Sequence, residues 1–206
     1  ATSNLKWLNK AIELDKTLSK NYEDTENGGF FMTSSDHEEL LVREKPSRDG
    51  STPSGNSIEA MNLLRLHQFT TNDSYRKRAV KLFKNFTGKI QQSPTSLSEM
   101  LMAWDYYLDE PKQVLIVMPD GKSREKNKLM PVLRKKFLPN KVVSVINHGN
   151  MQKDHSKVIP LLKQKIPMKN KTTAYVCRGG VCRLPTPKMT EFKEQISEVN
   201  MLEGEQ

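Results

Sequence analysis

The chain has 206 residues, a length that accommodates one large domain or two modest ones. Hydrophobic residues make up 35% of it and charged residues 28%, a polar composition that still excludes wholesale disorder. The net charge of +9 is uneven, because residues 1–110 carry 14 Lys and Arg against 16 Asp and Glu, whereas residues 111–206 carry 19 against 8.

Apolar side chains recur every three or four positions in the first half of the chain, which predicts amphipathic helices. The predicted helices cover residues 4–22, 57–69, 74–90 and 96–108. The second is apolar over much of its circumference, so we expect it to be buried on most sides. After the first helix, residues 29–33 and 40–42 predict either a small hairpin or a loop excursion.

The pattern changes after Pro111, where continuous apolar runs alternate with helical stretches. The runs lie at residues 114–118, 142–146 and 173–177, and the helical stretches near 123–138, 153–166 and 188–199. Strands that are apolar on both faces and alternate with helices indicate βαβ units and a parallel sheet. We therefore predict a mainly α chain with a helical region at 1–110 and, at 111–206, a small basic α/β segment with a parallel sheet of about three strands.

Several short motifs occur in an order that resembles the spermatogenesis-associated protein 20 family of thioredoxin-domain-containing proteins. They are Asn27-Gly28-Gly29-Phe30-Phe31, Lys45, Asp49-Gly50, Pro53-Ser54-Gly55-Asn56-Ser57, Asn62-Leu63-Leu64-Arg65-Leu66 and Tyr175-Val176-Cys177 with Cys182 and Pro185. The loop Pro53 to Ser57 with its following helix is the most specific of them.

The resemblance implies a longer parent protein with three parts. These are a thioredoxin-like domain, a central (α/α)6 barrel similar to six-hairpin glycosidases and N-acylglucosamine 2-epimerases, and a C-terminal extension. This chain would hold the last antiparallel helical hairpins of an incomplete barrel and the extension, and its partners would be the remaining barrel and the thioredoxin-like domain. It would then contribute to a carbohydrate-active hydrolase or epimerase-like enzyme without being active alone.

The loop at residues 45–57 is the main candidate site. As one wall of a pocket for a carbohydrate-like molecule, it would present Asp49 as the catalytic group and Lys45, Ser54 and Asn56 as ligand-binding groups. The alternative is a structural loop in which Ser or Asn caps the helix that begins near Ser57. Two further carboxylates in the preceding turn, Asp36 and Glu38, are weaker candidates, since a glycosidase needs two acids at a set separation.

Cys177 and Arg183 have the C-x5-R spacing of a cysteine phosphatase loop. Pro185 and Pro187 argue against that reaction, because the loop should lead directly into a helix. Cys177 and Cys182 could also form a reversible disulfide, but we expect two buried structural thiols. No metal site or cofactor is predicted, and we interpret two of the four histidines, His148 and His155, as surface loop residues.

The basic second half can mark an anionic partner, since clustered cations raise the local potential. Its cations are mostly Lys with few aromatic residues, so we do not expect nucleic acid, and a solvated Lys-rich face is the simpler interpretation. No apolar run approaches the ~20 residues of a membrane-spanning helix, and two cysteines are too few for a disulfide-stapled scaffold. We therefore expect a soluble cytoplasmic protein without a membrane partner.

Three functions remain open from the sequence alone. The first is a contribution to a carbohydrate-binding pocket in the parent protein. The second is a non-catalytic interaction or scaffold module that docks its partner on the basic C-terminal segment, and the third is a phosphatase-like site at Cys177.

Overall fold

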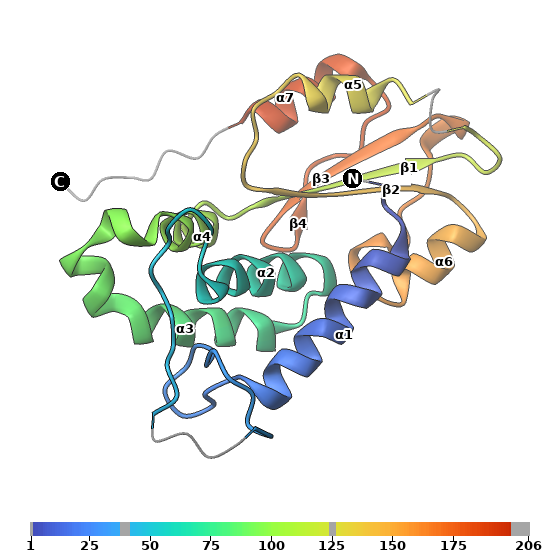
Figure 1. Cartoon of the computed structure of the whole chain (residues 1–206). Helices are drawn as coiled ribbons and strands as arrows, with labels where there is room; N and C mark the ends of the chain where they lie inside the picture. The colour runs from blue at the N-terminus through green and yellow to red at the C-terminus, as the bar shows by residue number, and fades with distance from the viewer. Residues whose placement is uncertain (1, 38–41, 124–126, 199–206) are drawn as a thin grey trace. The chain divides into compact units, whose positions relative to one another are not determined.

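The computed structural model describes residues 2–37, 42–123 and 127–198 of the chain (Figure 1). These residues form two compact units. The helical unit consists of Asn4–His67 and Asn72–Leu108. The α/β unit consists of the described residues from Asp109 onward, together with residues 2–3 and Gln68–Thr71.

Four α-helices form the helical unit, and they begin and end close to the predicted positions. They are α1 (Leu5–Asn21), α2 (Gly55–Thr70), α3 (Asp73–Gln92) and α4 (Ser98–Leu108), with a 3-10 turn η1 (Pro94–Leu97) before α4. Local capping explains two of these starts. The side chain of Asn4 accepts a hydrogen bond from the backbone of Lys6, and that of Asn72 accepts one from Ser74.

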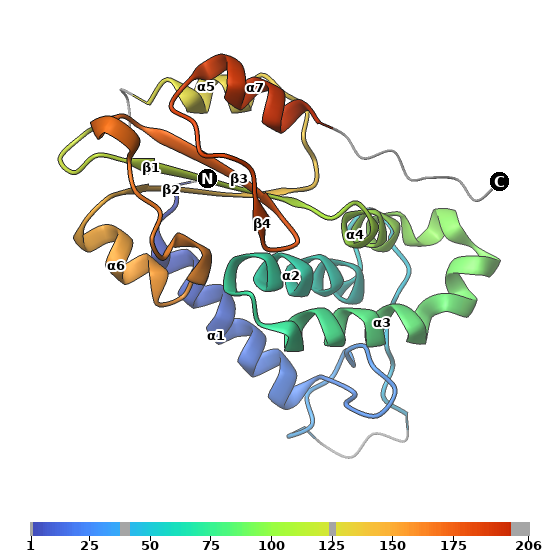
Figure 2. The same ribbon diagram turned by 180° about the vertical axis from the view of Figure 1, so that it is seen from behind.

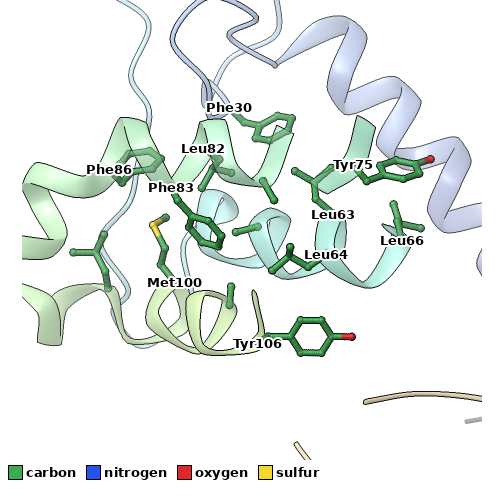
Figure 3. Packing of buried hydrophobic residues seen from close by; sticks show 14 residues of the cluster. Phe30, Leu63, Leu64, Leu66, Tyr75, Leu82, Phe83, Phe86, Met100 and Tyr106 are labelled. Atoms are coloured by element: carbon green, nitrogen blue, oxygen red, sulfur yellow. The ribbon is translucent and has the colours of Figure 1, made fainter. Parts of the chain in front are cut away.

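The core of the helical unit lies between α2, α3 and α4. Figure 3 shows Leu63 of α2, Phe83 of α3 and Met100 of α4 among its buried side chains, with Phe30 contributed by the loop after α1. Leu63, Met100 and the other largest members are at most a few per cent exposed. Helix α2 buries polar as well as apolar residues, which confirms that it is covered on most sides.

The predicted ladder of antiparallel hairpins from an incomplete (α/α)6 barrel is wrong. Figures 1 and 2 show α4 end-on, whereas α2 and α3 run across the view, so α4 does not lie antiparallel to α3. Between α1 and α2 the described residues form no helix, and Phe30 makes an isolated bridge with Glu23. Residues 38–41 of the predicted hairpin lie outside the described residues. Apolar spacing predicts that helices exist, but side-chain packing decides how they cross.

The α/β unit has a four-stranded mixed sheet in the order β2-β1-β3-β4. Its strands are β1 (Lys112–Met118), β2 (Lys141–Asn147), β3 (Thr173–Arg178) and β4 (Val181–Cys182). Its helices are α5 (Leu129–Arg134), α6 (Asn150–Ser156) and α7 (Met189–Ser197), with 3-10 turns η3 (Pro160–Leu162) and η4 (Met168–Asn170).

The predicted all-parallel sheet of about three strands is also wrong. β1 and β2 are parallel, in the register Val114 with Val143, which confirms one βαβ unit. β3 is antiparallel to β1, with Leu115 opposite Tyr175, and β4 is antiparallel to β3. An apolar run has the same appearance whichever way the strand points, so it predicts burial on both faces but not direction.

Both faces of the sheet carry helices. Figures 1 and 2 show α5 and α7 side by side over one face and α6 on the opposite side. Alternate residues of β1, such as Ile116, share a buried cluster with Leu133 of α5 and Phe192 of α7. This arrangement explains why β1 is buried along its whole length.

Helix α6 corrects the interpretation of His155 as a surface loop residue. His155 lies in α6 and is buried, with Nδ1 2.8 Å from the carbonyl oxygen of Met151 and Nε2 3.0 Å from that of Ser3. Among the described residues, no helix combines the length and apolar character needed to cross a bilayer.

Candidate functional site

The loop predicted as a carbohydrate-binding wall uses its polar groups inside the helical unit. Lys45 Nζ lies 2.5 Å from Asp24 Oδ2 and donates a second hydrogen bond to the carbonyl oxygen of Gly28. Its ammonium group also lies 5.0 Å from the centre of the Phe31 ring. Lys45 therefore anchors one end of the loop to the turn after α1.

Asp49 uses both carboxylate oxygens to hold the loop against α4. Oδ1 accepts a hydrogen bond from the backbone N–H of Ser54 at 2.8 Å, and Oδ2 accepts one from that of Glu99 at 2.9 Å. The second bond satisfies a free N–H in the first turn of α4, where the helix dipole favours a negative charge.

Ser54 and Asn56 are engaged in the same way at the start of α2. The hydroxyl of Ser54 accepts a hydrogen bond from the backbone of Ser57 and so caps the helix. The buried Asn56 amide donates to the carbonyl oxygens of Phe30 and Pro46 and accepts from the N–H of Phe30. All four predicted residues are thus engaged in structural hydrogen bonds, and the bond from the backbone of Ser54 to Asp49 joins two of them. Carbohydrate binding stays a prediction.

The two weaker carboxylate candidates add no second acid to this loop. Asp36 accepts a hydrogen bond from the hydroxyl of Ser34. Glu38 lies outside the described residues.

Sequence reasoning missed a buried cluster of charges between α1, α2 and α3. Arg78 Nε lies 2.8 Å from Glu23 Oε1, and Arg78 NH1 lies 2.9 Å from Asp15 Oδ1. Glu59 is only 5% exposed, and burial raises its pKa to about 7, opposed by a hydrogen bond from Asn62 and assisted by the charge of Asp15. The signal was present, since Asp15 and Glu59 occupy positions where the apolar spacing of their helices continues.

The α/β unit contains a basic cavity of about 310 Å³. Three cations line it, Lys112 of β1, Arg178 of β3 and Arg183 after β4, and one carboxylate, Glu198 after α7. The rest of the lining consists of Val176, Val181, Cys182 and Gln195. We call this space the basic cavity.

All three cations of the basic cavity converge on Glu198. Lys112 Nζ donates to the backbone carbonyl oxygen of Glu198 at 2.5 Å, and Arg178 NH2 donates to the same oxygen at 3.2 Å. Arg183 forms an ion pair with the Glu198 carboxylate. Part of this arrangement is structural, because cations are favourable beside the free carbonyl groups at the C-terminal end of a helix such as α7.

Two polar groups in the basic cavity are buried without full compensation by the residues around them. Lys112 is 5% exposed, and burial, with the charge of Arg178 next in effect, lowers its pKa. Among the described residues, the buried Oε1 of Gln195 has no hydrogen-bond partner, although Nε2 of the same side chain donates to Leu184. An anion would stabilise the buried ammonium group of Lys112, and a hydrogen-bond donor would satisfy Oε1 of Gln195.

Cys177 and Cys182 lie directly opposite each other in β3 and β4 and are joined by a disulfide. The sequence favours two buried thiols instead, because two cysteines in 206 residues do not indicate a disulfide. Residues 177–183 form a hairpin rather than a loop that enters a helix, and Cys177 is 1% exposed. In this state Cys177 offers no thiolate for a phosphatase reaction.

The basic cavity could not be found from sequence spacing. The charge excess in residues 111–206 indicates a basic surface, but only the pairing of β1 with β3 brings Lys112 beside Arg178. Glu198 joins them because α7 packs against the sheet.

No family model matches the chain. The chain is 30% identical over 189 residues to spermatogenesis-associated protein 20 of Homo sapiens and 27% identical over 195 residues to that of Mus musculus. The alignments cover 91% and 94% of this chain but 24% of each relative, so the chain spans about a quarter of their length. The predicted resemblance to these proteins is thereby confirmed over most of the chain.

Proposed function

We propose that the chain is a binding module whose α/β unit holds a small anionic group, a phosphate or a carboxylate, in the basic cavity. This function makes specific the second of the three left open by the sequence, an interaction module with a basic docking surface. The observation that carries it is the convergence of Lys112, Arg178 and Arg183 on Glu198 beside an open volume of about 310 Å³.

The Glu198 carboxylate shows the chemistry that the basic cavity accepts. The carboxylate forms an ion pair with Arg183, but the side chain of Arg183 is 61% exposed and that of Glu198 is 49% exposed. An exposed ion pair contributes only ~0–1 kcal/mol, so an incoming anion displaces it at little cost. Arg is well suited to the exchange, because its planar guanidinium group binds phosphate or carboxylate through two parallel hydrogen bonds.

The buried Lys112 should contribute more binding free energy to an anionic ligand than the exposed Arg183 does. Its ammonium group donates to the carbonyl oxygen of Glu198, and a desolvated cation is stabilised when a full negative charge approaches. A phosphate placed between Lys112 and Arg183 would therefore meet one buried and one adaptable cation.

Calorimetric titration of the chain with inorganic pyrophosphate tests this function. We expect saturable binding that weakens as salt rises and that falls about tenfold in Arg183→Ala, the loss of about one charge-assisted hydrogen bond. Lys193→Ala is the matched control, since Lys193 is an exposed cation of α7 outside the basic cavity. Equal affinities for the two variants would refute the proposal.

A further inference from the structure

We infer that Cys182 is the site at which an anionic low-molecular-weight thiol, of the glutathione type, reduces the Cys177–Cys182 disulfide through a mixed disulfide. The inference rests on the proposed anion binding in the basic cavity, and it adds a reaction to it. It starts from the fact that Cys182 forms part of the wall of the basic cavity.

The two sulfur atoms have different surroundings. Cys177 lies inside β3, 1% exposed, and does not line the basic cavity. Cys182 lies in the two-residue edge strand β4, is half-buried, and lines the cavity. A thiolate that enters the basic cavity therefore meets Cys182, and attack at Cys177 is sterically blocked.

Positive charge around Cys182 favours the approach of an attacking thiolate and the release of Cys182 as a thiolate at the end of the reaction. Lys165 Nζ lies 3.5 Å from Cys182 Sγ, and Arg183 is the next residue in the chain. Cations beside a sulfur atom stabilise its thiolate. The same cations attract an attacking thiolate, and electrostatic attraction of this kind raises association rates by roughly 10-fold to 10³-fold.

The basic cavity also fits the rest of such a thiol. Glutathione is a tripeptide with two carboxylates and peptide N–H groups. Its carboxylates match Lys112 and Arg183, and an N–H group matches the unpartnered Oε1 of Gln195. The Glu198 carboxylate already shows how Arg183 holds a carboxylate there.

The reaction proceeds in two balanced steps. First, the thiolate of one reagent molecule attacks Cys182 Sγ, a new S–S bond forms, and the Cys177–Cys182 bond breaks. Its electron pair goes to Cys177, which takes up the proton that the reagent thiol lost. Second, another reagent thiolate attacks the reagent sulfur of the mixed disulfide, and Cys182 leaves as a thiolate beside Lys165 and then takes up the proton that the second reagent thiol lost. One protein disulfide and two thiols thus become a protein dithiol and the oxidised reagent.

The burial of Cys177 slows its return onto the mixed disulfide. A sulfur buried among apolar side chains stabilises a thiolate poorly, so it persists as the thiol. Only a thiolate attacks a disulfide, so Cys177 returns slowly to displace the reagent. We therefore expect the adduct at Cys182 to be lost mainly through the second step, so quenching early in the reaction captures it.

The test compares reduced glutathione with neutral 2-mercaptoethanol, each scaled to its thiolate concentration, at low ionic strength. After acid quenching, the mass of the chain and of its peptides reports the adduct. We expect one glutathionyl group on Cys182, formed about tenfold faster than the 2-mercaptoethanol adduct. Arg183→Ala and high salt remove the advantage of glutathione, whereas Lys193→Ala keeps it. An adduct on Cys177, or equal rates for the two thiols, would overturn the inference.

A second variant tests glutathione binding beside Cys182 when the Cys177–Cys182 disulfide cannot form. In Cys177→Ser the free Cys182 is treated with oxidised glutathione, and the same adduct with the same loss in Arg183→Ala is expected. Pyrophosphate titration separates the two proposals. If pyrophosphate binding depends on Arg183 but glutathione shows no advantage, only the thiol reaction fails. If neither depends on Arg183, both fail.

Discussion

Asp49 accepts a hydrogen bond at 2.9 Å from the backbone N–H of Glu99, fifty positions further along the sequence. The other carboxylate oxygen of Asp49 accepts from Ser54, so one side chain joins the loop before α2 to the first turn of α4. The residue that most resembles a catalytic acid in the sequence thus connects two parts of the helical unit.

Replacing Asp49 by Ala should therefore destabilise the chain. Two backbone N–H groups lose their acceptor, and each partly buried unsatisfied donor costs about 1–3 kcal/mol. Denaturant unfolding measures the loss, and Glu26→Ala serves as the control because Glu26 is exposed. An unchanged unfolding midpoint in Asp49→Ala would mean that its carboxylate is free for another role.

Glu59 makes the stability of the helical unit depend on pH. Burial raises its pKa from 4.5 to about 7, so the folded state binds its proton more tightly than the unfolded state does. Its contribution is complete below pH 4.5 and is lost as pH rises to about 7. Glu59→Gln, which stays neutral, should be more stable than the wild type at pH 8 and similar at pH 4.5.

Urea unfolding at several pH values measures this difference. A shift of this size corresponds to a few kcal/mol at most. Glu13→Gln on the exposed face of α1 is the control, since it should leave the pH profile unchanged. If Glu59→Gln loses stability equally at both pH values, the carboxyl group is not held neutral by burial.

Elements were predictable from the sequence where local rules decide them. Asn4 and Asn72 mark helix starts because capping is local, and the apolar runs mark β1, β2 and β3 because burial on both faces is visible in one segment. The direction of β3 and the crossing of α4 depend on packing between distant segments. No spacing within one segment encodes either of them.

The candidate sites follow the same division. The capping role of Ser54 was predictable as the alternative to ligand binding, because it needs only the next three residues. The partners of Asp49 and Arg178 lie 50 and 20 residues away and depend on the fold. Asp15 and Glu59 occupy buried positions on the apolar faces of their helices, so the helix pattern shows that they are unusual. The pattern does not show which residue each of them contacts.

Gly28 should tolerate no side chain. Its φ of +83° favours glycine, and a Cβ atom there would lie 2.6 Å from the backbone oxygen of Lys81 in α3. Gly28→Ala should cost at least ~1–3 kcal/mol of unfolding free energy from backbone strain alone. Gly50→Ala is the matched control, because nothing lies within 4 Å of a Cβ atom at Gly50. Thermal unfolding measures the midpoint temperature of both variants. Equal midpoints for Gly28→Ala and Gly50→Ala would show that a side chain at Gly28 causes no strain.

Reduction of the disulfide should weaken the β3–β4 hairpin without unfolding the chain. A bond between residues at a sequence separation of 5 contributes about 2 kcal/mol through the entropy of the unfolded state. The double variant Cys177→Ser with Cys182→Ser should match the reduced wild type in chemical unfolding. A variant as stable as the oxidised wild type would show that the disulfide contributes nothing to the hairpin.

We propose that the basic cavity takes an anion in the place of the Glu198 carboxylate. In Glu198→Gln the competing charge is lost while the backbone carbonyl that Lys112 and Arg178 contact remains. Pyrophosphate titration of Glu198→Gln, beside Glu194→Gln on the exposed face of α7, tests the claim most directly. We predict binding tighter by about two- to fivefold for Glu198→Gln only, since an exposed ion pair is worth at most ~1 kcal/mol. Equal or weaker binding by Glu198→Gln would contradict it.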